Sequence, residues 1–189
     1  MKVCLVYSGW LRTWEQCKGN HAERLTPAPA HVVHYNENTP FEDEPYLTDE
    51  WGYNANKAGE NEAWNTINMW RAMWRAWQRT PQGFDVYVRM RYDIIFDGII
   101  DFTQFDYPPN RVYIPDGNDY RDGVNDQMAI GSWEAMHAYH AVYLDHPEHF
   151  AAGKMFHSES YLKYTLDKRG INIVRIPVRN SIVRHETKA

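Results

Sequence analysis

The chain has 189 residues, a net charge of −5 and two cysteines, Cys4 and Cys17, with no metal-ligand spacing around either. This length predicts one domain over residues 1–189 that buries a core without disulfides or a structural metal. No apolar stretch reaches the roughly 20 residues that span a bilayer, and the first residues lack a signal-peptide pattern. We therefore expect a cytoplasmic protein with no membrane span.

The acidity is local. Eight acidic residues lie between Glu37 and Glu62, against Lys57 alone, so the rest of the chain is slightly positive. No basic tract is long enough to predict binding to nucleic acid. The segment from Glu37 to about Gly59 has no sustained period, and loops of this length are typically lids, binding loops or disordered.

Strands and helices alternate along the chain. A buried strand is predicted at 2–7, a short helix at about 11–18 that Gly19 and Asn20 end, and a second strand at 31–35. A helix at 63–78 carries an almost wholly aromatic face, with arginines on the opposite side. We expect that face to cover a sheet, and a sugar-binding surface is the alternative. The face comprises Trp64, Ile67, Trp70, Trp74 and Trp77, and the arginines are Arg71, Arg75 and Arg79.

The second half continues this alternation. Strands are predicted at 111–115, 127–131 and 171–178, and a flexible polar loop at 116–126. Ser132 is expected to cap a helix at about 133–144, and Ser158 a helix that ends at Gly170. With no internal repeat or linker, the pattern predicts one layered α/β domain with a mixed central sheet flanked by helices.

The most informative stretch is 84–98. Val86, Val88 and Met90 alternate with polar residues, as in a strand, and Arg89, Arg91 and Asp93 follow closely at its end. In open α/β sheets ligands bind at the carboxyl ends of strands. Two guanidiniums and a carboxylate there favour an anionic ligand, possibly with a metal. A surface ion-pair ladder remains the alternative.

Three further clusters are candidates. Ser8, Gly9 and Arg12 lie where a strand meets a helix amino terminus, a place that favours a phosphate. Asp126 ends the polar loop and could simply satisfy its own backbone. Glu159 starts a helix, where the helix dipole alone could explain it. Phosphate-loop, dinucleotide, nucleophile-elbow and zinc motifs are absent from the sequence.

Five segments, in order, resemble small bacterial and viral glycosyltransferases of the GT-A nucleotide-sugar-binding, Rossmann-like fold. They are YSGWLRT, HVVHYNE, RMRYDIIF, NDQMAIGS and HSESYLKYTL. The resemblance implies an enzyme of glycan or polysaccharide biosynthesis that moves a sugar from a nucleotide-sugar donor to a glycan acceptor. The residues that this implies for nucleotide-sugar binding are Ser8, Gly9, Arg12, Arg89, Arg91 and Asp93.

The chain departs from the acidic DxD motif of that family, because Arg91 replaces its first aspartate. Arginines and a divalent cation (Mn²⁺ or Mg²⁺) are the two ways to neutralise a leaving diphosphate. We expect Asp93 to hold the cation, with His185 as a second ligand; alternatively, Asp93 accepts a sugar hydroxyl.

An inverting transfer needs a general base, whereas a retaining transfer does not. We expect Asp126 to be that base and Glu159 to bind a sugar or acceptor hydroxyl. The acidic loop would then be a lid on the acceptor side. A non-catalytic carbohydrate-binding protein and a structural or assembly protein are the alternatives from other functional classes.

Overall fold

The computed structural model describes residues 1–9, 11, 13–36 and 60–184. The predicted lid at 37–59, Arg12 and His185 lie outside the described residues. The helices are α1 (Trp14–Arg24), α2 (Glu60–Gln78), α3 (Trp133–His140), α4 (Val142–Ala151) and α5 (Ser158–Lys168). The main sheet has six strands in the order β3 (His31–Asn36), β1 (Val3–Gly9), β4 (Val86–Met90), β8 (Met128–Gly131), β7 (Arg111–Pro115) and β9 (Asn172–Ile176).

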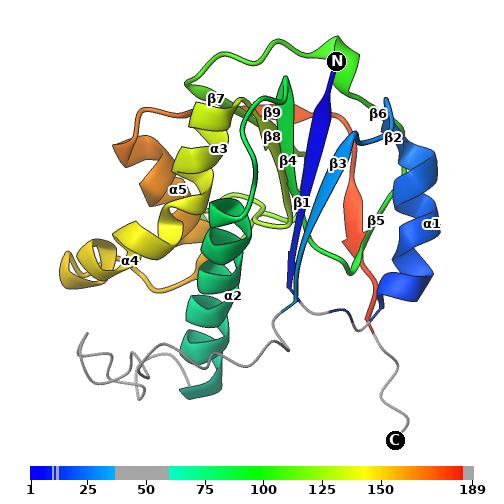
Figure 1. Ribbon diagram of the computed structural model, residues 1–189. Helices are drawn as coiled ribbons and strands as arrows, with labels where there is room; N and C mark the ends of the chain where they lie inside the picture. The colour runs from blue at the N-terminus through cyan, green and yellow to red at the C-terminus, as the bar shows by residue number, and fades with distance from the viewer. Residues whose placement is uncertain (10, 12, 37–59, 185–189) are drawn as a thin grey trace, which may run out of the picture.

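This sheet is mixed. β1 pairs in parallel with β3 and β4, whereas β8 runs antiparallel to β4 and β7, and β9 is parallel to β7. The chain leaves β1 through α1 to reach β3, and returns through α2 to β4. These two helices lie on opposite sides of the sheet (Figure 1). The predicted α/β class, with a mixed central sheet flanked by helices, is confirmed.

Short strand pairs complete the described part of the chain. β10 (Asn180–Ile182) pairs antiparallel with β5 (Ile94–Phe96), and β2 (Leu25–Thr26) pairs parallel with β6 (Ile100–Asp101). The first of these pairs joins the end of the chain to the segment directly after β4. That segment contains Asp93, whose carbonyl accepts a hydrogen bond of 2.7 Å from the Val183 N–H.

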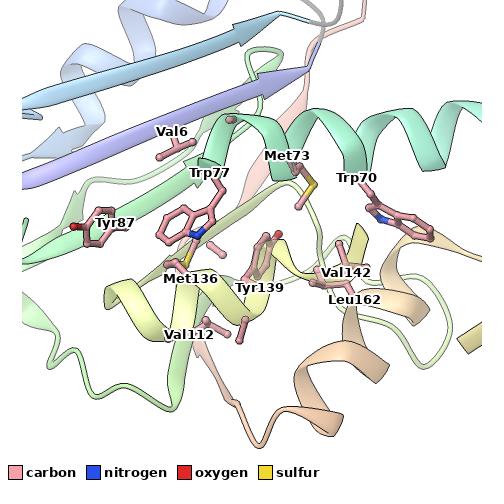
Figure 2. Packing of buried hydrophobic residues seen from close by; sticks show 14 of the residues in the cluster. Val6, Trp70, Met73, Trp77, Tyr87, Val112, Met136, Tyr139, Val142 and Leu162 are labelled. Atoms are coloured by element: carbon pink, nitrogen blue, oxygen red, sulfur yellow. The ribbon is translucent and has the colours of Figure 1, made fainter. Parts of the chain in front are cut away.

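From Ile67 to Trp77, the aromatic face of α2 packs in the core. Trp70, Met73 and Trp77 are at most 2% exposed and pack towards Tyr139 of α3 (Figure 2). Alternate residues on the strands fill this layer, because successive side chains of a strand point to opposite faces. The prediction that the aromatic face covers the sheet is confirmed for these residues. Arg71, which the sequence puts on the side of the helix opposite the aromatic face, is 4% exposed and thus also buried.

The bounds of the helices differ from the sequence prediction in two places. α1 starts at Trp14 and runs through Gly19 and Asn20 to Arg24, because the Asn20 side chain bonds both backbone groups of Phe96 in β5. The predicted helix at 133–144 is divided at Ala141 into α3 and α4. Tertiary contacts and local caps, rather than residue propensity, set these ends.

The helix caps agree with the sequence prediction in one case and differ from it in the other. The Ser132 hydroxyl accepts a hydrogen bond from the Ala135 N–H, which confirms it as the cap of α3. At α5 the cap position belongs to His157, and Ser158 is the first helical residue.

Cys4 and Cys17 are buried free thiols. None of the described helices is long and apolar enough to cross a membrane.

Candidate active site

The carboxyl ends of β1 and β4 lie side by side. Their parallel register puts Val6 beside Arg89 and Tyr7 beside Met90. β4 ends there, one residue before Arg91, and β1 continues through Ser8 to Gly9. Ser8 is 1% exposed, and its hydroxyl has no hydrogen-bond partner among the described residues. The adjacent Gly9 has a φ of +121°, a conformation that other residues rarely adopt. These sequence-predicted residues therefore meet at one edge of the sheet.

Arg89 is completely buried. It lies on the face of β4 that α2 and α3 cover, and its Nη1 donates a hydrogen bond to the backbone carbonyl of Asp126. Its Nε and Nη2 have no partner within the described part of the chain. Burial lowers the pKa of Arg89, and the nearby Tyr139 and Asp126 partly oppose that effect. Arg89 thus lies beneath the 116–126 loop and anchors it.

Arg91 is the accessible arginine of the pair. Its Nε and Nη2 donate to the two carboxylate oxygens of Asp93 at 2.8 and 2.6 Å, a bidentate ion pair. The two side chains are 27% and 20% exposed. Ion pairs that reach solvent contribute about 1 kcal/mol or less, so a diphosphate can replace the carboxylate on Arg91. In the ligand-free chain, this pair also agrees with the alternative of a surface ion pair that binds no ligand.

Of the two predicted metal ligands, the structure describes only Asp93. Both oxygens of Asp93 are occupied by Arg91, and His185 lies outside the described residues. Across the described ranges, no three His, Cys, Asp or Glu side chains are grouped to hold an ion. Asp93 alone does not make a protein-held site for a divalent cation.

The 116–126 loop, predicted to be flexible, is fastened by hydrogen bonds. Asn125 is fully buried, and its Nδ2 donates to Oδ1 of Asn180 at 3.0 Å and to the Gly117 carbonyl at 3.1 Å. Its backbone N–H donates to Asp119, which also pairs with Arg175 at 2.7 Å. The loop is therefore bound to β9 and β10, and it holds Asp126 in one position.

Asp126 and Glu159 meet where this loop contacts the start of α5. The Val124 N–H donates to the Glu159 carbonyl at 3.2 Å. A Cβ added at Gly123 would lie 2.5 Å from both the carbonyl carbon and the Cβ of Glu159, so only glycine permits this approach. Burial raises the pKa of Glu159, and the negative charge of Asp126 raises it further. Two predicted catalytic residues, distant in sequence, thus lie together beside Arg89.

Asp126 and Glu159 differ in their exposure to solvent. Asp126 as a whole is 4% exposed, whereas the Glu159 side chain is 14% exposed. Glu159 also has partners that the sequence analysis did not identify: the Ser158 hydroxyl donates to its Oε2, and Nδ1 of His157 lies 2.6 Å from the same oxygen. Tyr139 is a buried neighbour whose hydroxyl has no partner among the described residues.

Carboxylates in contrasting environments beside buried cationic groups are typical of acid–base sites. Comparison of the chain with protein-family models and with curated proteins finds no match.

Proposed function

We propose that this chain is a glycosyltransferase that moves a sugar from a nucleotide-sugar donor to a glycan acceptor hydroxyl, on a fold of the GT-A type. One observation carries the proposal. Residues from β1, β4, the 116–126 loop and α5, selected separately from the sequence, converge at one edge of the sheet. A cytoplasmic location, the host cytoplasm if the source is viral, belongs to the same proposal.

The donor diphosphate binds, in this proposal, beside Arg91 and Ser8. As the bond between the sugar and the diphosphate breaks, negative charge grows on the leaving oxygen, and fixed positive charge stabilises it. A guanidinium about 4 Å from a phosphate oxygen gains roughly 4 kcal/mol at an effective dielectric near 20. Arg91 exchanges Asp93 for the phosphate, while buried Arg89 keeps the loop and Asp126 in place.

The proposal is tested by calorimetric titration with UDP, GDP, CDP and ADP. Arg91→Ala is expected to weaken the tightest of these about 10–100-fold, since hydrogen bonds to charged groups contribute roughly 1.5–3 kcal/mol. Arg111→Ala is the matched control, because Arg111 begins β7 at the opposite end of the sheet and pairs with Asp106 at 2.7 Å. Failure of every nucleotide to bind the unmodified chain would favour a carbohydrate-binding or structural protein.

Asp93→Ala separates the two roles predicted for Asp93. In metal-free buffer this variant is expected to bind the nucleotide about threefold to tenfold more tightly, because Arg91 no longer has to leave an ion pair worth about 1 kcal/mol. The same titration with Mn²⁺ measures the cation that the resemblance implies. If Mn²⁺ tightens binding to the unmodified chain but not to Asp93→Ala, Asp93 holds it. Weaker metal-free binding by Asp93→Ala would contradict the exchange of Arg91 between carboxylate and phosphate.

A further inference from the structure

His157 and Glu159 form a pair at the edge of the proposed site. Nδ1 of His157 lies 2.6 Å from Oε2 of Glu159, and the side chains are 34% and 14% exposed. This separation is that of an ion-pair contact, although the ring orientation does not give Nδ1 hydrogen-bond geometry towards Oε2. Nδ1 itself is buried, so the exposed third of the histidine lies away from it. A histidine with one nitrogen against a carboxylate and the other free is prepared to accept a proton.

The imidazole ring is held in a fixed orientation. It stacks on Tyr120 of the 116–126 loop, with ring centroids 4.0 Å apart and planes at 19°. The carbonyl of His157 accepts a hydrogen bond of 3.0 Å from the Tyr161 N–H, which fixes its backbone. Among the residues that the structure describes, Nε2 of His157 has no hydrogen-bond partner. This nitrogen therefore remains available to a ligand.

The surroundings of Glu159 make it an effective partner. Asp126 is the neighbouring negative group, the Ser158 hydroxyl donates to the same carboxylate, and Arg89 and Tyr139 lie behind Asp126. A carboxylate that is partly buried beside a second negative charge stabilises a cation more strongly than an exposed carboxylate does. Glu159 is thus a partly buried carboxylate held against the ring of His157.

We propose that His157 is the general base of sugar transfer and that Glu159 orients it and stabilises its cation. This inference rests on the proposed glycosyl transfer. Nε2 takes the proton from the acceptor hydroxyl as that oxygen bonds to the anomeric carbon of the donor sugar. The bond from that carbon to the diphosphate oxygen breaks, and its electron pair leaves with the nucleoside diphosphate. Asp126, 4% exposed, acts through Glu159 instead of touching the acceptor.

The tautomer of His157 tests the pair without any substrate. In ¹⁵N-labelled protein at neutral pH, long-range proton–nitrogen spectra are expected to show neutral His157 protonated on Nδ1, opposite to the preference of free histidine. His157→Gln identifies the signal, and Glu159→Gln is expected to move the proton to Nε2. An Nε2-protonated His157 in the unmodified chain would overturn the pair.

Nucleoside diphosphate release tests the base. UDP-glucose, UDP-N-acetylglucosamine and GDP-mannose are incubated with the protein, with water as acceptor. His157→Ala is expected to slow release about 100-fold or more, with nucleotide affinity unchanged, because general bases contribute about 10²–10⁴. Added imidazole should restore part of the rate in His157→Ala alone. His31→Ala is the control, since His31 also stacks on an aromatic ring, Phe84 at 5.6 Å, but begins β3.

The outcomes separate the two proposals. If the unmodified chain binds no nucleotide and releases none, the glycosyltransferase assignment fails, and the base assignment fails with it. If it releases nucleotide and His157→Ala is as fast, the base assignment fails while the transferase assignment stands.

Discussion

Glu159→Gln is expected to slow nucleoside diphosphate release roughly 10²–10⁴-fold while nucleotide affinity stays within about twofold. The substitution preserves size and removes the negative charge that faces Nδ1 of His157 at 2.6 Å. Without that charge the imidazolium formed during transfer loses its partner, and the ring can protonate on Nε2, which leaves no base for the acceptor. Release rates at saturating donor, with affinity measured separately by calorimetry, check this result.

Asp126→Asn is the matched variant, because it makes the same change from carboxylate to amide on the adjacent residue of the site. Arg89 bonds the backbone carbonyl of Asp126, so the substitution leaves that anchor in place. We expect a smaller loss of release rate than in Glu159→Gln, since Asp126 acts only through Glu159. The sequence prediction, with Asp126 as the base, gives the reverse order: Asp126→Asn abolishes release, and Glu159→Gln mainly raises KM. If Asp126→Asn releases nucleotide more slowly than Glu159→Gln, the assignment of the general base to His157 is contradicted.

The sequence predicts much of this site because its signals are local. The alternation in β4 correctly predicts a strand that ends beside Arg91, and the residues flanking each element locate Ser8, Asp126 and Glu159 at the ends of strands or helices. What the alternation cannot predict is which face is covered. Arg89 is buried because the distant loop carrying Asp126 closes over it, a contact that residue spacing does not encode.

The sequence groups His157 with Glu159 at a helix start but does not predict their contact, for a different physical reason. Residues two apart in a helix point to different sides, so a histidine two positions before Glu159 is not expected to meet it. His157 lies just outside α5 with an extended backbone, φ −160° and ψ 146°, and this conformation turns its ring towards the first turn. Predicting that contact requires the exact start of the helix, which sequence patterns locate only to within a few residues.

The second large effect expected is a fall in stability in mild acid, caused by two buried histidines of α3 and α4. Burial lowers the pKa of His140 to about 3 and that of His146 to about 4. The unfolded chain takes up these protons near pH 6.5, whereas the folded chain does not. Their full contribution is therefore present above about pH 6.5 and is lost as the pH falls below it, at about 1.4 kcal/mol per pH unit for each histidine. At about pH 4.5 the two together cost roughly 5 kcal/mol, a large share of the stability of a typical domain.

Urea unfolding between about pH 4.5 and pH 7.5 measures this slope, and His140→Phe assigns it. His140 stacks on Trp77 with centroids 4.7 Å apart and donates from Nδ1 to the Met136 carbonyl at 2.7 Å. Phenylalanine keeps the stack and cannot take up a proton, so the variant is expected to lose about 1.4 kcal/mol per pH unit of the slope whatever its stability at neutral pH. His31→Phe, a change at an exposed histidine, should leave the slope unchanged. If His140→Phe has the same slope as the unmodified chain, His140 takes up its proton at the same pH in the folded and the unfolded state. That result requires α3 to open before the rest of the core unfolds.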